Sequence, residues 1–479
     1  MIKQLFCSLI LFLSATRLIA QQGYDISVQV KPYHNQFLYL GYYYGKVRAL
    51  QDSVMLDANS QGRFKGAKPL PGGIYFLVSP SKQILFELLI DKDQQFSVVA
   101  DTSELPASVE FKGSDDNSQF QQYSIFAGNT GRKINSLNNN YASAKTKQDS
   151  VIIASGVKSL TNELNKYRDS TIRKDSASFL SALFNAMNEP KIPPAKEQPG
   201  GKYDSNFVYH FYKEHYWDGI SFADDRLVRT PFFEPKLDKY LQDIVAPNPD
   251  SLISETDNML LQSRTAPEMY RYLMVSFVQR FVNPQYMGQD AVFVHLFEKY
   301  INTGKAEFFT SQYRDFATKR AYSLMANLIG QAAPPLDLTD TADHALPLYG
   351  VKGNFVVICF WDPNCSHCKE VVPKVDSIFK AKWKKQGVQI YAVKVDGTKS
   401  EWLKFIHDHH LRDWKHVYQQ EAKQKLEEKE GRPGFRQLYD VYQTPLLYLL
   451  DKDKRIIAKK LSYLQIDEVI SIKLKSNKP

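Results

Sequence analysis

The chain has 479 residues, 43% of them hydrophobic, and a formal net charge of +9 at pH 7. This length implies about three domains, and the hydrophobic fraction is ample for packed cores. The positive charge is scattered, and its densest cluster, residues 380–385, has the pattern of a solvated helix end. This argues against a nucleic-acid-binding protein and leaves only weak attraction to an anionic surface.

The N-terminus predicts export. A short basic start precedes an apolar run over residues 5–13, and Ala20 offers a small residue at a cleavage point. This pattern is typical of a secretory signal peptide over residues 1–20, and no other apolar run approaches the ~18–20 residues needed to cross a bilayer. We therefore expect a periplasmic protein without a stable membrane span, whose mature form keeps the cysteines Cys359, Cys365 and Cys368.

Residues 21–115 predict an antiparallel β-sandwich. Apolar and polar residues alternate over residues 24–30, and short strand-like runs follow at about ten-residue spacing, separated by turns such as Pro71–Gly73. No catalytic constellation stands out here. The aromatic residues favour core and sheet-face packing over a ligand site.

Residues 116–328 predict an all-α region. Thr265 is a suitable N-cap, with Pro267 in the first turn, for a helix that ends at about Val282. Such a region would bind or position a partner rather than perform chemistry. The other predicted helices cover residues 150–172, 289–302 and 308–327.

The C-terminal region carries a C-x-x-C motif, Cys365 and Cys368. It follows an apolar strand over residues 355–360 and opens an amphipathic helix. At the helix N-terminus, unpaired N–H groups and the helix dipole favour a thiolate at Cys365, and Cys368 lies one turn away, where it can resolve a mixed disulfide. A zinc site would need a second pair of ligands at suitable spacing, which the chain lacks. The context therefore favours redox chemistry.

Two more apolar strands, residues 388–395 and 446–450, and a final helix from about Gln465 complete an α/β pattern. The segment 329–479 resembles the thioredoxin fold of TlpA/ResA-like extracytoplasmic thiol–disulfide oxidoreductases. Residues 70–92 and 215–233 contain blocks that resemble modules of unknown function from Bacteroidota. The residues that carry the thioredoxin resemblance are Trp361, Cys365, Cys368, Pro373 and Thr444-Pro445.

The resemblance implies roles for individual residues. Cys365 would be the attacking nucleophile and Cys368 the resolving thiol. Pro445 would follow a cis peptide bond that faces the cysteines, and the Thr444 backbone would pair with an extended substrate chain. Trp361 would shape the site beside the substrate, unless it only packs the core.

Two features depart from the pattern of the family. Thioredoxins often carry a buried acid six residues before the first cysteine, where this chain has Cys359, which we interpret as a core residue. Asp396 is a candidate substitute for that acid, and the alternative is that it caps the next helix. His367, between the cysteines, resembles the histidine of isomerases and oxidases. An imidazole there favours the Cys365 thiolate and a more oxidising disulfide, but it does not fix the direction of electron flow.

Two other kinds of site fit the sequence less well. His407 and His410 share a helix face and could grip a metal, but the patch has a solvated pattern, and we expect neither metal nor cofactor. A peroxide-reducing enzyme would need Thr or Ser three residues, and Pro seven residues, before the reactive cysteine. This chain has Asp362 and Ile358 there.

The sequence thus predicts a multidomain enzyme, an exported thiol–disulfide oxidoreductase that acts in cell redox homeostasis. Its expected partners are thiols or disulfides of exported proteins and a redox partner protein. The alternative is a non-enzymatic periplasmic scaffold or binding protein with a vestigial redox domain. The predicted segments are a signal peptide (1–20), a β-sandwich (21–115), a helical domain (116–328) and a thioredoxin-like α/β domain (329–479).

Overall fold

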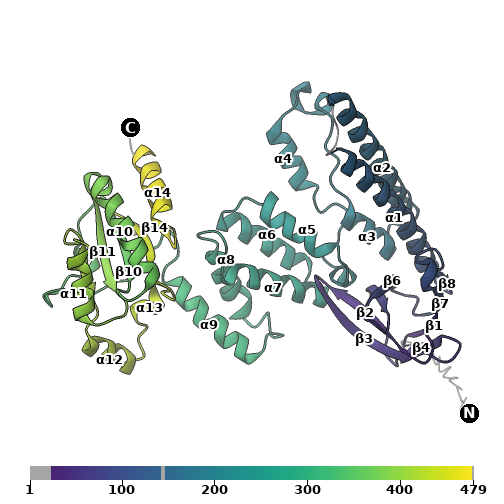
Figure 1. Ribbon diagram of the computed structural model, residues 1–479, viewed down its shortest axis with the longest axis horizontal. Helices are drawn as coiled ribbons and strands as arrows, with labels where there is room; N and C mark the ends of the chain where they lie inside the picture. Colours follow the sequence, from purple (N-terminus) through teal and green to yellow (C-terminus); the bar gives the residue numbers. More distant parts are fainter. Residues whose placement is uncertain (1–22, 142–145, 477–479) are drawn as a thin grey trace, which may run out of the picture. The chain divides into compact units, whose positions relative to one another are not determined.

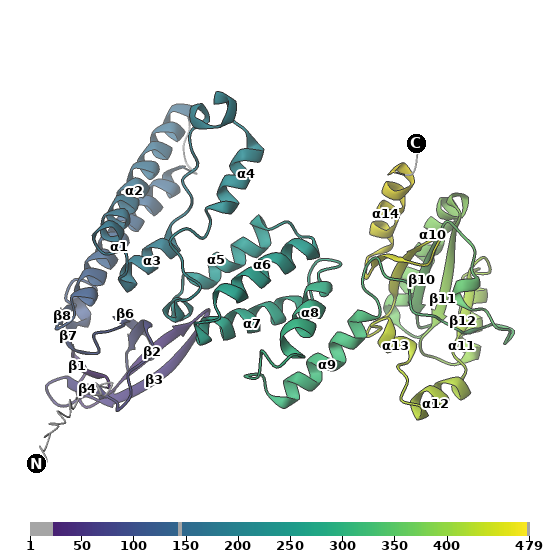
Figure 2. The same cartoon turned by 180° about the vertical axis from the view of Figure 1, so that it is seen from behind.

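The computed structural model describes residues 23–141 and 146–476 (Figures 1 and 2). The predicted signal peptide lies outside them. The chain forms two compact units: the residues up to Tyr240 with Gln262–Met269, and Leu241–Leu261 with the residues from Tyr270 onward. The boundary predicted between residues 328 and 329 falls inside the second unit, and the four-segment scheme stays a prediction. Within the described ranges, no helix combines the length and apolar character that a membrane crossing requires.

Eight strands of the first unit form two four-stranded sheets: β1 (Asp25–Lys31), β2 (Phe37–Tyr44), β3 (Val47–Met55), β4 (Gln61–Lys65), β5 (Gly73–Val78), β6 (Ile84–Ile90), β7 (Gln95–Asp101) and β8 (Glu110–Lys112). Their orders are β4-β1-β7-β8 and β3-β2-β5-β6. Alternate residues of β1, such as Ile26 and Val28, are buried in a core that Leu40 and Leu77 of the second sheet also enter. The period-two pattern therefore produces the predicted sandwich.

One strand pair departs from the expected antiparallel arrangement. β1 and β7 run parallel, with Asp25 opposite Gln95, whereas the other pairs in the two sheets are antiparallel. Between β1 and β7 the chain builds five strands and crosses between the sheets. The two strands are therefore not joined by a hairpin, and antiparallel pairing is not imposed on them.

Helices cover the other face of the second sheet. Ile74 and Phe76 of β5 pack against Phe120 and Leu183, so β5 is buried on both faces and reads as a continuous apolar run. The helices of this unit are α1 (Asp115–Tyr141), α2 (Lys147–Lys174), α3 (Phe179–Met187), α4 (Ser205–Glu214) and α5 (Phe233–Lys239), and α1 lies beside α2 (Figure 1).

Four helices precede the C-terminal domain: α6 (Pro249–Gln262), α7 (Pro267–Val282), α8 (Asp290–Leu296) and α9 (Ser311–Met325). α7 confirms the predicted helix and its end at Val282. Pro267 is its first residue, so Ala266, and not the predicted Thr265, directly precedes the helix. α9 begins three residues later than predicted, because the Thr310 side chain accepts a hydrogen bond from the Tyr313 N–H and caps the helix there.

The C-terminal domain has a six-stranded sheet of order β14-β13-β10-β11-β12-β9. Its central strand β10 runs parallel to β11 and antiparallel to β13. Residues 329–338 precede β9 without forming a strand, and Ala332 makes an isolated bridge with Arg455. The strands are β9 (Thr339–Asp340), β10 (Phe355–Trp361), β11 (Val388–Lys394), β12 (Lys415–Tyr418), β13 (Leu446–Asp451) and β14 (Ile456–Lys459).

Both faces of this sheet are covered. Val357 on one face of β10 belongs to a core with residues of α10, α11 and α14, and Ile358 on the other face joins a core around Tyr439. The loops after β10 and β11 and before β13 meet at one sheet edge, because Phe360 lies opposite Leu446 and Trp361 opposite Lys394. These layers confirm the predicted fold class. The helices are α10 (Ser366–Ala381), α11 (Lys399–Asp408), α12 (Glu421–Lys429), α13 (Phe435–Leu438) and α14 (Tyr463–Ser476).

Candidate active site

The two cysteines of the motif lie at the start of α10. After β10 the chain turns at Asp362, whose carboxylate accepts a hydrogen bond from the Asn364 N–H at 2.8 Å. This turn places Cys365 at the N-cap of α10 in extended backbone conformation (φ −68°, ψ 123°), with no side-chain cap hydrogen bond. Its half-buried sulfur therefore lies beside the unpaired N–H groups of the first turn.

The surroundings separate the acidities of the two thiols. Burial opposes ionisation of Cys365, but hydrogen bonds from the backbone N–H groups of Cys368 and His367 bring its pKa below the ordinary value. Cys368 is fully buried, and desolvation raises its pKa to about 12. The pair thus consists of one accessible acidic thiol and one buried thiol that stays protonated.

Thr444 and Pro445 face this pair. The peptide bond between them is cis, as the resemblance implied. The Thr444 carbonyl accepts a hydrogen bond from the Cys365 thiol, with 3.4 Å between Sγ and O. Both residues are half-buried, so part of each is exposed to solvent.

Trp361 does not reach the surface of the site. Its side chain is fully buried, and its ring packs on Phe405 with 5.0 Å between centroids. The prediction of a direct substrate contact is therefore corrected to core packing behind the active-site loop. The reason is that Trp361 still belongs to β10, whose seven residues are all buried.

Cys359 is fully buried in the core, as predicted, and desolvation raises its pKa further than that of Cys368. Asp396 is exposed, and its carboxylate pairs with the Arg436 guanidinium at 2.6 Å. The alternative that Asp396 caps the next helix is wrong, because Thr398 caps α11 in a capping box with Glu401.

His367 lies exposed in the first turn of α10. Its backbone N–H is one of the groups that lower the Cys365 pKa. His407 and His410 do not share a helix face, contrary to the sequence pattern, because α11 ends at Asp408 and His410 adopts a left-handed backbone conformation (φ 54°). Among the described residues, no cluster of three metal-ligating side chains occurs.

Known proteins resemble this domain in sequence. A family model described as thioredoxin-like matches residues 353–456. The C-terminal region belongs to the thioredoxin-like family. A second model, a domain of unknown function (DUF5106), matches residues 143–318 and includes the segment 215–233, for which such a module was predicted.

Individual relatives cover parts of the chain. The thiol-disulfide oxidoreductase ResA of Oceanobacillus iheyensis is 31% identical over 87 residues, which are 17% of this chain and 45% of that protein. The chain thus spans less than half of this curated relative. A domain of a possible thiol-disulfide isomerase from Cytophaga hutchinsonii is 35% identical, with 32% of this chain and 96% of that domain covered and a TM-score of 0.28. A thioredoxin-like protein from Bacteroides caccae is 20% identical, with 60% and 98% covered and a TM-score of 0.46.

The thioredoxin-like domain also places Lys394 at the site, a residue that the sequence analysis did not single out. Lys394 ends β11 opposite Trp361, and its Nζ donates to the Gly397 carbonyl at 2.6 Å. Burial lowers the pKa of Lys394, while the nearby carboxylates of Asp396 and Asp362 act in the opposite sense. The sequence signal that could have identified Lys394 is its position as a lysine at the end of an apolar strand.

A polar pocket of about 480 Å³ opens beside Lys394 and Asp396. Gly397 connects it to the active-site loop, because a Cβ there would lie only 2.9 Å from Cγ of Pro363. The pocket and the cysteines therefore share one edge of the thioredoxin-like domain.

Proposed function

We propose that this chain is an exported thiol–disulfide oxidoreductase that exchanges disulfides with protein substrates through its Cys-Ser-His-Cys motif. The observation that carries the proposal is the unequal pair: Cys365 is accessible with a lowered pKa, and Cys368 is buried with a pKa of about 12. Thiol–disulfide exchange needs one thiolate that attacks and a second thiol that reacts only afterwards.

The reaction follows from this asymmetry. The Cys365 thiolate attacks one sulfur of a substrate disulfide, and the second substrate sulfur leaves as a thiolate. Cys368 then loses its proton and attacks Cys365 Sγ, which releases the first substrate sulfur and leaves a Cys365–Cys368 disulfide. The substrate gains two electrons and the motif loses two. A thiol-bearing redox partner returns the motif to the dithiol, and the reverse sequence oxidises a substrate dithiol.

The other predicted residues assist this exchange. The Thr444 backbone, whose carbonyl lies 3.4 Å from Cys365 Sγ, pairs with an extended substrate chain, and Pro445 keeps that backbone facing Cys365. Asp396 lies at the same sheet edge. Once its carboxylate separates from Arg436, Asp396 accepts the proton that Cys368 loses. His367 stabilises the Cys365 thiolate through its backbone N–H. Trp361 supports the loop from the core.

Export through cleavage after residue 20 and a periplasmic location belong to the same proposal. They rest on the basic and apolar pattern of residues 1–20. Cys365 and Cys368, which remain after cleavage, also suit an oxidising compartment, where exported proteins form disulfides.

Trapping of substrates tests the proposal. Cys368→Ala should accumulate mixed disulfides with exported proteins through Cys365, because the resolving thiol is missing, and Cys365→Ala should trap none. Cys359→Ala is the matched control, since it removes a buried thiol outside the motif. Non-reducing gels followed by mass spectrometry read out the adducts.

Insulin reduction separates the proposal from the alternative of a non-enzymatic binding protein. The wild type should reduce insulin with a thiol donor, and the Cys365→Ala/Cys368→Ala variant should not. Equal rates for the two proteins, at the level of the donor alone, would leave only the binding role.

A further inference from the structure

α9 contacts the segment that leads to Thr444. Arg320, Ser323 and Asn327 lie on one side of α9 and its C-terminal end, at helical spacing. Ser323 Oγ donates to the Gln437 carbonyl at 2.6 Å, and Asn327 Nδ2 donates to the Leu438 carbonyl at 2.8 Å. The last carbonyls of a helix lack partners further along the helix, and α9 donates to two of these carbonyls at the end of α13. The Gln437 carbonyl also accepts from the Asp440 N–H at 3.2 Å.

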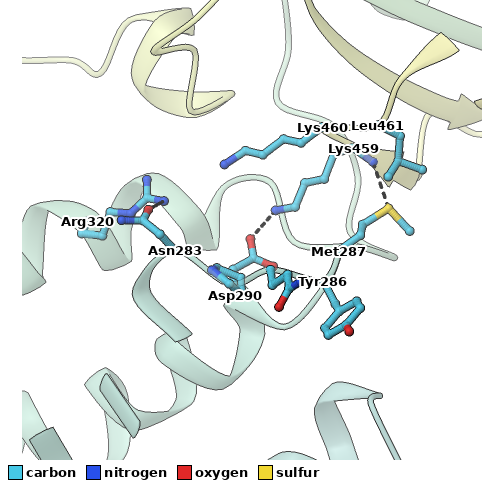
Figure 3. Close-up of a pocket in the computed structure, with 11 residues that line it drawn as sticks. Asn283, Tyr286, Met287, Asp290, Arg320, Lys459, Lys460 and Leu461 are labelled. Atoms are coloured by element: carbon cyan, nitrogen blue, oxygen red, sulfur yellow. Dashed lines mark hydrogen bonds and ion pairs between the residues drawn. The ribbon is translucent and has the colours of Figure 1, made fainter. Parts of the chain in front are cut away.

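The third contact is a buried ion network. Asp440 follows α13 in a left-handed backbone conformation (φ 52°), and its side chain is 1% exposed. Its carboxylate pairs with Arg320 and with Lys460. Arg320 also donates through Nη2 to the Val282 carbonyl at 3.2 Å and to Asn283 Oδ1 at 2.9 Å, the latter drawn in Figure 3. The Arg320 guanidinium therefore links the end of α7 to Asp440, which begins the segment that leads to Thr444.

The charges of this network are maintained in the fold. Burial raises the pKa of Asp440, but Lys460 and Arg320 outweigh that effect and hold it below the ordinary value. Asp440 is therefore a carboxylate at neutral pH and needs both cations, because an uncompensated buried charge is strongly unfavourable.

A second buried pair holds the adjacent strand end. Lys459 Nζ lies 2.5 Å from Asp290 Oδ2 and donates to the Asn327 carbonyl at 2.8 Å, and the Lys459 N–H donates to Met287 Sδ at 3.3 Å (Figure 3). These directional bonds define the register between α7–α9 and the thioredoxin-like domain more sharply than apolar packing alone would.

The network is four residues from the redox site. Residues 441–445 connect Asp440 to β13, and the Thr444 carbonyl in this stretch accepts from Cys365 Sγ at 3.4 Å. Release of Asp440 frees one end of this short connection, so Thr444 can shift relative to Cys365.

We propose that Arg320 is a positioning residue of the redox site, which acts through Asp440 to hold the Thr444 backbone in register with Cys365 for an incoming protein chain. This inference rests on the proposed function. It makes α9, which lies outside the matched residues 353–456, a part of substrate recognition by the thioredoxin-like domain.

The test compares two disulfides in the full chain. Arg320→Met should lower the second-order rate constant for insulin by about 10- to 100-fold, because small misplacements of a binding group have effects of that size. The rate constant for the small disulfide DTNB should stay within about twofold, since DTNB needs the thiolate but no backbone pairing. Arg314→Met is the matched control, because the hydrogen bonds that this arginine of α9 makes to described residues go to the nearby carbonyls of Glu307 and Phe309.

Hydrogen exchange gives a readout that needs no enzymatic activity. The amides of residues 441–444 should exchange faster in Arg320→Met and at an unchanged rate in Arg314→Met. Arg320→Lys should restore part of the insulin rate. Equal losses with insulin and DTNB, or unchanged exchange of the loop, would overturn the positioning role. A wild type that exchanges no disulfides, combined with faster loop exchange in Arg320→Met, would overturn the proposed function and leave the structural coupling standing. Should Arg320→Met not fold, Asp440→Asn provides the same two readouts.

Discussion

The two cysteines of the motif should react with iodoacetamide at very different rates. The pKa of Cys368 is raised from an ordinary 9.0 to about 12, so its thiolate fraction at neutral pH is about 1000-fold below that of a free cysteine. The pKa of Cys365 is lowered, so its thiolate fraction exceeds that of a free cysteine. Only the thiolate is alkylated. The reduced protein should therefore take up one alkyl group at pH 7, on Cys365.

Timed alkylation between pH 6 and 9, followed by peptide mass spectrometry, measures both rates. Cys365→Ala controls for reaction elsewhere and should leave Cys368 unmodified on the same time scale. The denatured wild type should show similar rates at each cysteine, because the folded environment is gone. Comparable rates for Cys365 and Cys368 in the folded wild type would refute the assigned roles.

Two further predictions concern stability. The pKa of buried His416 is lowered from 6.5 to about 4, so its contribution to the unfolding free energy is complete above pH 6.5 and is lost as the pH falls through 4. Denaturant titrations should show a loss of up to about 3 kcal/mol over this window, and His416→Gln should remove that part of the pH dependence; an identical pH profile in the variant would contradict the assignment. Asp290→Asn should lower the unfolding free energy by about 3–5 kcal/mol, because Lys459 is left buried without its counter-charge. The double variant Asp290→Leu/Lys459→Met should lose much less, and a double loss as large as the single one would contradict this account.

Much of the redox site was readable from the sequence. The strand, the C-x-x-C motif and the helix behind it lie within 30 residues, and their order places Cys365 at a helix N-terminus by local geometry alone. The helix that ends at Val282 was predicted to within one residue at its start, because the signals of a helix start act within one turn. The sandwich strands were visible through period-two alternation.

Other features of the site cannot be predicted from any short stretch of the sequence. Asp396 appeared as a free acid or a helix cap, but its partner is Arg436, 40 residues away. Trp361 appeared available to substrate, because its burial depends on helices that cover the sheet. Some of these helices come from distant parts of the chain, so the residues around Trp361 do not reveal that it is buried.

The sequence by itself determined the elements, the motif and the likeness to thioredoxin-like domains, because hydrophobic periodicity and capping act between near neighbours along the chain. Only the tertiary structure decided that β1 pairs in parallel with β7, and that Arg320 meets Asp440 across 120 residues. A charged residue has the same appearance in a sequence whether it is solvated or buried against a counter-charge. The free energies of these two states differ greatly, and the difference depends on what the rest of the fold places around the charge.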